Sequence, residues 1–143
     1  MIYILAKNLQ KIIAQAQAEL PNECCGLLSG LTNQDFTEII EVYPMNNIDQ
    51  SPQHFSLDPQ EQFDVMYKAR DKGYKILGNY HSHPTDPARP SKEDIRLAYD
   101  PNALYLIISL LEPTNPVCKA YRIGSDEVTE IPLKIKQTKE RGQ

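Results

Sequence analysis

The sequence predicts an α/β domain in which a single mixed β-sheet is flanked by helices. Three observations lead to this prediction: apolar or alternating segments of strand length recur along the chain, two segments carry apolar residues at helical spacing, and turn residues separate them. A length of 143 residues fits one domain, and the hydrophobic content of 41% is ordinary for a globular protein. We assign residues 1–135 to this domain and residues 136–143 to a polar C-terminal tail.

The first half of the chain is expected to alternate between strands and helices. Short extended segments bounded by turn residues predict strands, and apolar residues three and four positions apart predict helices. The expected elements, in order, are an edge strand at 2–5, a helix at 8–20, strands at 24–29 and 36–43, an extended piece at 54–57 and a helix from Asp58-Pro59 to Gly73. A short turn joins the strands at 24–29 and 36–43, so we expect a hairpin there. The longest structureless loop is expected at 44–52.

The second half of the chain is expected to supply the rest of the sheet. A strand over residues 74–81 leads into a proline-rich turn, after which Ser91 opens a further helix. Residues 104–111 are an unbroken apolar run of strand length, which predicts a central strand. Residues 117–123 and 128–135 alternate apolar and polar side chains, which predicts two later antiparallel strands.

One segment in this half carries three side chains of the kinds that bind metal ions. His81 and His83 stand two residues apart at the end of the predicted strand, so both imidazoles point to the same face of the sheet. Asp94 lies in the first turn of the helix that begins at Ser91, where its carboxylate can point back towards the strand. Two histidines and one carboxylate suit a zinc ion that keeps its fourth position for water, which is typical of catalytic rather than structural sites.

The same residues also have ordinary structural interpretations. Paired histidines on a strand are often solvated polar side chains, and short motifs carry a risk of false positives. Ser91 and Asp94 are fully explained as a capping box, a role that is compatible with chemistry at the same place. Ser82 points to the opposite face of the strand, where we expect a packing hydrogen bond. His54, the third histidine, is expected in a loop and outside the metal site.

A glutamate far upstream completes a family pattern. Glu23 stands directly before an apolar Cys-Cys-Gly strand, and His81-Ser-His83-Pro is followed after six residues by Ser91 and then by Asp94. This arrangement resembles the JAMM family of metalloproteases, also known as MPN-plus or Mov34-type. The resemblance covers most of the chain, from the first helix to the predicted central strand. It implies the cytidine-deaminase-like (JAB/MPN) fold of that family, in which helices flank a curved sheet.

The resemblance also implies roles for these five residues. His81, His83 and Asp94 would hold one Zn²⁺ per chain, Glu23 would be the general base, and Ser91 would donate its hydroxyl to the developing oxyanion. JAMM proteins hydrolyse peptide or isopeptide bonds after the C-terminal Gly-Gly of ubiquitin-like proteins, and short prokaryotic members release an amino acid such as cysteine from a sulfur-carrier protein. This chain has the compact form of those short members, which implies a Gly-Gly-ended protein as its substrate and partner.

Two other classes of function stay open at this point. The chain could be a non-catalytic protein-interaction module of the MPN fold, although the presence of all five motif residues argues against this. It could also be a zinc hydrolase of another small peptide or amide. A zinc deaminase is disfavoured, because the sequence has neither His-x-Glu nor Pro-Cys-x-x-Cys. The His-Glu-x-x-His motif of helical zinc proteases is also absent from the sequence.

Composition and charge narrow the range of partners. The 15 basic and 19 acidic residues are well mixed and give a net charge of −4, so nothing indicates nucleic-acid binding. No apolar segment has the length of a membrane span and the first residues lack the features of a signal peptide, so we expect a cytoplasmic protein. Cys24, Cys25 and Cys118 form no Cys-x-x-Cys pair, and the first two are expected to be small buried hydrophobic residues. The oligomeric state cannot be predicted from the sequence.

Overall fold

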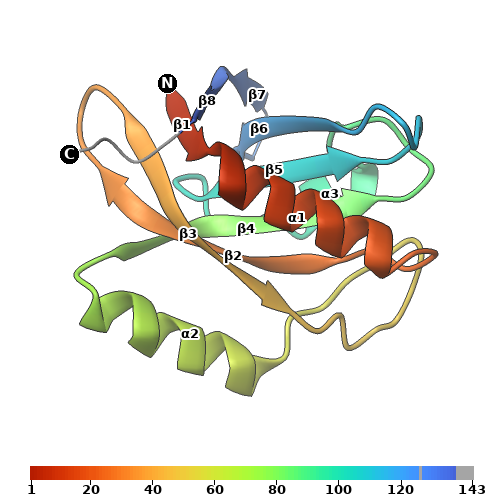
Figure 1. Cartoon of the computed structure of the whole chain (residues 1–143), viewed down its shortest axis with the longest axis horizontal. Coiled ribbons are helices and arrows are strands. Elements are labelled where there is room, and N and C mark those ends of the chain that lie inside the picture. Colours follow the sequence, from red (N-terminus) through yellow and green to blue (C-terminus); the bar gives the residue numbers. More distant parts are fainter. Residues whose placement is uncertain (126, 138–143) are drawn as a thin grey trace.

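The chain folds into one eight-stranded mixed sheet with helices packed on it, as Figure 1 shows for the computed structural model. The structure describes residues 1–125 and 127–137. Its elements are β1 (Ile2–Leu5), α1 (Ala6–Ala18), β2 (Cys25–Thr32), β3 (Thr37–Met45), α2 (Pro59–Asp71), β4 (Lys75–His83), α3 (Lys92–Arg96), β5 (Leu104–Ser109), β6 (Val117–Ile123), β7 (Val128–Ile131) and β8 (Leu133–Lys136). The predicted mixed sheet flanked by helices is therefore confirmed. No helix in the described part of the chain combines the length and the apolar character that a membrane crossing requires.

The two ends of the sheet correct two predictions. The strand order is β7-β6-β5-β4-β2-β3-β1-β8, so β1 is an inner strand and not the predicted edge strand. The segment predicted as one antiparallel strand at 128–135 is divided at Pro132, which has no N–H group to donate to a neighbouring strand. Its first part pairs antiparallel with β6, whereas its second part pairs parallel with β1 at the opposite end of the sheet.

This division also curves the sheet. β7 and β8 are neighbours in sequence but lie at the two ends of the strand order, so the sheet must bend back towards itself (Figure 1). Between β7 and β8, the carbonyl oxygen of Pro132 accepts a hydrogen bond from the amide of Ile2. β8 extends the ordered domain through Lys136. Most of the predicted tail, residues 138–143, lies outside the described residues, and its separation from the domain stays a prediction.

The helices and the first hairpin follow their local sequence signals closely. β2 and β3 form the predicted antiparallel hairpin. α2 begins after Asp58, whose carboxylate accepts a hydrogen bond from the Gln60 amide, and the chain leaves it at Gly73 with a positive φ of 82°. α1 was predicted at 8–20 but ends at Ala18, because the residue before a proline disfavours helical geometry and Leu20 precedes Pro21.

One face of the sheet holds the main hydrophobic core. α1 covers this face and buries Ile12 and Ala16 against it. The strands contribute alternate residues, as expected for the period of two along a strand. The fully buried members from the strands include Ile4, Leu28, Ile39, Leu104, Leu106 and Ile108. This core fixes the relative positions of β2, β4 and β5, the three strands on which the candidate site is built.

A bulge in β4 decides which face its histidines occupy. In the ladder between β2 and β4, Leu28 pairs with Gly78 and the next residue pairs with Ile76, so Leu77 is the extra residue. Leu77 and Tyr80 both pack into the core beneath α1. His81 consequently points to the opposite face, where α2 lies and where a cleft opens. β4 also runs two residues beyond its predicted end, through His83.

Candidate metal centre

Three side chains from β4 and α3 converge on one point. His81 and His83 lie at the end of β4, and Asp94 lies in the short helix α3. The two Nε2 atoms are 3.2 Å apart, and Asp94 Oδ2 lies 3.2 Å from His81 Nε2 and 3.1 Å from His83 Nε2. Both imidazoles are buried, and the Asp94 side chain is 14% exposed. Within the described residues this is the group of side chains arranged to hold a metal ion.

The spacing of the ligand atoms and the protonation of His83 fit a small cation with tetrahedral coordination. In a tetrahedral zinc site with bonds of about 2.0–2.1 Å, neighbouring ligand atoms are separated by about 3.3 Å. His83 Nδ1 lies 2.8 Å from the carbonyl oxygen of Pro87, which can only accept a hydrogen bond. Nδ1 therefore carries the proton of the neutral ring, and Nε2 presents its lone pair to the centre. The residues present can thus accommodate a metal ion without rearrangement.

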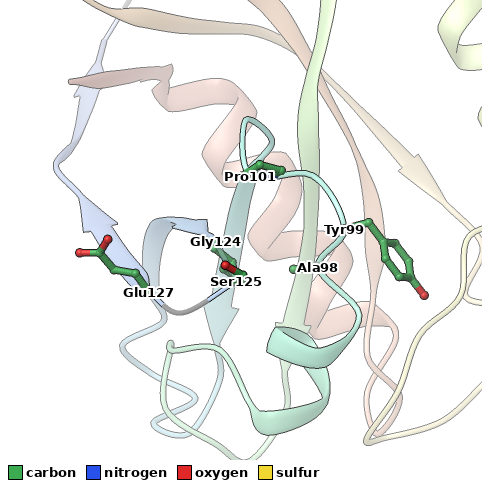
Figure 2. A pocket seen from close by; sticks show the side chains of 7 residues that line it. Ala98, Tyr99, Pro101, Gly124, Ser125 and Glu127 are labelled. Atoms are coloured by element: carbon green, nitrogen blue, oxygen red, sulfur yellow. The ribbon is translucent and has the colours of Figure 1, made fainter.

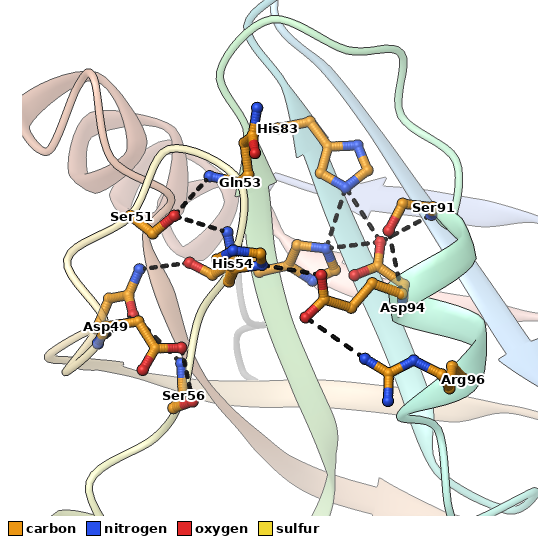
Figure 3. A network of polar contacts seen from close by, with 12 residues as sticks. Asp49, Ser51, Gln53, His54, Ser56, His83, Ser91, Asp94 and Arg96 are labelled. Atoms are coloured by element: carbon orange, nitrogen blue, oxygen red, sulfur yellow. Dashed lines mark hydrogen bonds and ion pairs between the residues drawn. The ribbon is translucent and has the colours of Figure 1, made fainter.

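The third side chain of the group, Asp94, is held in place by the start of its own helix. Ser91 Oγ accepts a hydrogen bond from the Asp94 amide at 3.0 Å, and the Ser91 amide donates to Asp94 Oδ2 at 2.9 Å. These two bonds form the capping box predicted from the sequence. Figure 3 shows Ser91 beside the Asp94 carboxylate, which points towards the His83 ring. The cap uses the acceptor capacity of the Ser91 hydroxyl and leaves its proton free for another acceptor.

The electrostatic state of the group favours charge on the aspartate. Burial acts against ionisation of Asp94, but its contacts with the two imidazoles hold the pKa of this carboxyl well below its usual range. Burial lowers the pKa of His81. Burial also acts against the charged form of His83, but the neighbouring carboxylate of Asp94 raises the pKa of that ring. A negative carboxylate beside two nearby imidazoles is an arrangement that attracts a cation.

Glu23 reaches the same site from the neighbouring strand, because it lies just before β2, which pairs with β4. Cys25 at the start of β2 pairs with His81, and the Ser82 amide donates to the Cys24 carbonyl oxygen at 3.1 Å. The Cys24 amide in turn donates to Ser82 Oγ at 2.8 Å, which confirms the packing hydrogen bond predicted for Ser82. The serine between the two histidines thus fixes the residue next to Glu23, and the antiparallel course of the chain continues Glu23 to the level of His83.

The Glu23 carboxyl is buried and free to act. Its side chain is part of a residue only 5% exposed, and none of the described residues forms a hydrogen bond with its Oε1 atom. Burial raises the pKa of Glu23 to about 8, while the charge of His83 acts in the opposite direction. A buried carboxyl without a partner is uncommon in proteins and is a frequent mark of a functional group.

A loop that the sequence did not connect with the site covers one side of it. Phe55 stacks on His81 with ring centroids 4.7 Å apart and an angle of 20° between the planes. The preceding residue in the loop, His54, is not among the converging side chains and instead places Nδ1 2.8 Å from Glu93 Oε1 on α3 (Figure 3). His54 thus lies in a loop and apart from the converging side chains. Neither contact has a local signal, because each joins residues far apart in sequence.

A cleft of about 430 Å³ opens beside His81 and Asp94. Phe55 and Leu57 from the loop line it, together with Leu97 and Tyr99 after α3, and its further lining includes Ser56, Gln62, Asn79, His81, Asp94 and Tyr105. Tyr99 also borders a second hollow of about 520 Å³, and Figure 2 shows its ring turned away from the other residues labelled there. The described residues that line this second hollow include none of the metal-site side chains.

The cysteines do not contribute a nucleophile to the site. Cys24 and Cys25 are both fully buried, as predicted, and both are free thiols. Burial raises the pKa of each to about 12, so the reactive thiolate is scarcely populated at neutral pH. Burial also raises the pKa of Cys118 to about 12. The imidazoles, the carboxyls and Ser91 are therefore the candidate groups for chemistry at the site.

Comparison with known proteins agrees with this site. A family model described as prokaryotic homologues of the JAB domain matches residues 5–124. The CysO-cysteine peptidase of Mycobacterium tuberculosis is 33% identical over 135 residues, which cover 94% of this chain and 91% of that protein. The desampylase of Pyrococcus furiosus is 27% identical over 92 residues, which cover 64% of this chain and 63% of that protein.

A solved structure is similar over nearly the whole chain. The solution structure of a protein from Desulfitobacterium hafniense superposes with a TM-score of 0.90 at 50% sequence identity, covering 96% of this chain and 94% of that chain. The resemblance to the JAMM family and its JAB/MPN fold, predicted from five residues, is thereby confirmed. Because the family model spans most of the chain and the mycobacterial relative is matched over nine-tenths of its length, this protein belongs to the prokaryotic homologues of the JAB domain.

Proposed function

We propose that this protein is a zinc-dependent peptidase that cleaves the bond after the C-terminal Gly-Gly of a sulfur-carrier or ubiquitin-like protein. The observation that carries the proposal is the convergence of two imidazole Nε2 atoms and one carboxylate oxygen within 3.2 Å of one another, next to a buried carboxyl that is free to act. Relatives that are peptidases of protein conjugates support the reaction class.

The ligand set determines what the metal can do. His81, His83 and Asp94 would hold zinc through three protein atoms and leave a fourth position for water or substrate, the ligand count of catalytic sites. Zinc bound in this way lowers the pKa of a coordinated water towards neutrality and polarises a carbonyl group. The stacked ring of Phe55 keeps bulk water away from His81 on one side.

In this proposal Glu23 is the general base and later the general acid. Its carboxyl has a free Oε1 and a raised pKa of about 8, which lies near the operating pH that acid–base catalysis favours. Glu23 would accept a proton from the attacking water and then transfer it to the amine that leaves. A cation in the site would favour the carboxylate form, as the charge of His83 already does.

In this proposal Ser91 stabilises the oxyanion of the substrate. Its Oγ accepts the cap hydrogen bond from the Asp94 amide and the residue is exposed, so the hydroxyl proton is available for the substrate. One well-placed donor of this kind stabilises a transition state by roughly 3 kcal/mol. The cap fixes the Ser91 side chain before substrate arrives, which reduces the reorganisation that the reaction requires.

A glycine tail suits the shape of the cleft. Large side chains from two segments line it, Phe55 and Leu57 before α2 and Leu97 and Tyr99 after α3, so an extended chain would reach the metal ligands past large side chains. Glycines can take such a path most closely, because they have no bulky side chain.

The three free cysteines and the absence of disulfide bonds among the described residues support a reducing compartment, and we place the reaction in the cytoplasm.

The direct test is the intact mass of a sulfur-carrier protein extended by cysteine beyond its Gly-Gly. Zinc-loaded parent protein should remove the cysteine, and the Glu23→Gln variant should do so at least about a hundredfold more slowly while it keeps its zinc. The variant is the matched control, because the amide has the size of the carboxyl but cannot take up the proton. Equal rates for the two proteins would exclude Glu23 as the base.

The substrate class is tested separately from the chemistry. A panel of sulfur-carrier and ubiquitin-like proteins, each with a short extension after Gly-Gly, should include at least one that is cleaved. If every carrier stays intact while an unrelated short peptide is hydrolysed, the protein is a zinc hydrolase of another substrate. If a carrier binds to zinc-loaded parent protein and is never cleaved, the protein is an interaction module, and the proposed activity is wrong.

A further inference from the structure

A polar side chain on the floor of the cleft is not used by the site described above. Asn79 lies on β4 two residues before His81 and lines the same cleft. Its Oδ1 atom is buried, and no residue in the described part of the chain forms a hydrogen bond with it. Buried polar atoms in native proteins are nearly always paired. An unpaired amide oxygen at the edge of a candidate active site therefore points to a ligand that pairs with it.

Two other polar side chains that line the cleft have hydrogen-bond partners within the protein. On the adjacent strand β5, Tyr105 stands opposite Asn79 and directs its hydroxyl to the Asp100 carbonyl oxygen at 3.5 Å. Across the cleft, Ser56 Oγ donates to the Asp49 carboxylate at 2.8 Å. These polar groups of the cleft already have partners within the protein. The Asn79 amide oxygen differs from them, and it shares its lack of a partner among the described residues with His81 Nδ1, two residues further along the same strand.

The distance from His81 to Asn79 indicates which part of a substrate it would meet. Residues two apart on a strand are separated by roughly 6.6 Å, which is also about two residues of an extended peptide. A substrate whose scissile carbonyl lies at the metal ligands and whose tail extends over Asn79 places its penultimate residue near this side chain. The main chain of β4 already pairs with β2 and β5 at Asn79, so its side chain is the group left to bind the tail.

We propose that Asn79 is a positioning residue that forms hydrogen bonds with the main chain of the penultimate glycine of the substrate. This inference rests on the function proposed above. The Asn79 amide carries both an acceptor and a donor, which match the N–H and C=O groups that an extended peptide presents. The apolar side chains of Phe55, Leu57 and Leu97 border the same cleft, and a hydrogen bond shielded from water is stronger than one in solvent.

The test uses the exchange of Asn79 for a side chain of similar size without polar atoms. Asn79→Leu should lower kcat/KM for the carrier extended by cysteine about tenfold, because a hydrogen bond to the tail is lost. The free protein should melt at the parent temperature or above it, since the exchange removes a buried polar atom that has no partner. Zinc content should equal that of the parent. Asn115→Leu, the same exchange at an exposed loop position outside the cleft, is the matched control and should keep the parent kinetics.

A change in the substrate isolates the proposed contact. A carrier with N-methylglycine in place of the penultimate glycine lacks the N–H group that Asn79 Oδ1 would accept. This substrate should slow the parent about tenfold relative to the ordinary carrier and slow Asn79→Leu less than about twofold, because the second change removes an interaction already lost. Equal penalties in the two proteins would show that the N–H group pairs elsewhere and would overturn the assignment.

The remaining outcomes separate this inference from the function on which it rests. If the parent cleaves the carrier and Asn79→Leu does so with the same kcat/KM, Asn79 does not position the substrate and the proposed function stands. If Asn79→Leu melts below the parent or loses zinc, its role is structural and the inference is overturned. If the parent neither cleaves nor binds any Gly-Gly-ended carrier, the proposed function fails first and the assignment of Asn79 fails with it.

Discussion

The two sides of the candidate metal centre are built in different ways. The ligand side comes from a short stretch of chain, in which His81, His83 and Asp94 contact one another and Ser91 caps the helix that carries the aspartate. The base side comes from Glu23, which is held through its backbone and whose Oε1 has no hydrogen-bond partner among the described residues.

This difference separates binding from chemistry. The ligand-side groups depend on one another, so a change in one of them alters metal affinity, local structure and activity together. Glu23 is positioned by the amide hydrogen bond to the Ser51 carbonyl oxygen and by the hydrogen bond that Asn47 Nδ2 donates to its own carbonyl oxygen. Its side chain can therefore change with little effect on the fold. The comparison is tested by substitutions on each side.

The largest effect is expected at Asp94. Asp94→Ala removes a proposed metal ligand and half of the capping box, so zinc affinity should fall more than about a hundredfold and activity should be lost. Zinc content after dialysis and cleavage of the extended carrier measure the two effects. Asp94→Asn is the matched control, because its amide oxygen can still accept the Ser91 hydrogen bond. It should melt closer to the parent than Asp94→Ala and still bind zinc poorly, and full zinc affinity in Asp94→Asn would contradict the ligand assignment.

A smaller effect is expected at Ser91, which caps the helix that carries Asp94 and is also the proposed donor to the oxyanion. Ser91→Ala should slow turnover about a hundredfold through the lost oxyanion donor and reduce the free energy of unfolding by about 1 kcal/mol through the lost cap. Turnover with saturating carrier and thermal melting measure these separately. Ser91→Thr keeps a hydroxyl and should retain most of both. A fall in stability with unchanged turnover would limit Ser91 to the capping role.

The smallest effect is expected on the stability of the metal-free protein at different pH values. The pKa of Glu23 is raised from 4.5 to about 8 by burial, so between these values the folded state keeps a proton that the unfolded state has released. This group therefore makes the parent less stable as pH rises through that window. Glu23→Gln cannot ionise, so relative to the parent it should gain about 1 kcal/mol or more between pH 4 and pH 8.

Denaturant unfolding of both proteins, with zinc removed by a chelator, measures this difference. His81, His83 and Asp94 are present in both proteins, so their own titration largely cancels in the comparison. A difference in stability that is the same at pH 4 and pH 8 would mean that Glu23 is solvated and ionises normally. Glu23 would then behave like an ordinary surface carboxylate, and the two sides of the centre would no longer differ in the burial of their charged groups.

The ligand side was accessible to prediction because its geometry is local. The period of two along a strand places His81 and His83 on one face, and the capping box places Asp94 in the first turn after Ser91. Both rules act over a few residues and need no knowledge of the rest of the fold. The role of each residue as a ligand or donor stays a prediction until the substitutions above are measured.

Features that depend on distant pairing were missed or misplaced. The bulge at Leu77 sets the face to which His81 points, yet it exists only in the ladder with β2. The stacking of Phe55 on His81 and the contact of His54 with Glu93 join loop and site across more than 25 residues of sequence. The division at Pro132 likewise depends on β1, which offers a partner to the second half of that segment.

The sequence by itself determined the elements, the family and the ligand candidates, because strand alternation, helix caps and the spacing of the motif are properties of neighbouring residues. The tertiary structure alone decided which face of the sheet carries the site, how deeply Glu23 is buried and which groups line the cleft. These properties depend on strand register and on the burial of charge, and both arise when segments that are far apart in the chain pack together.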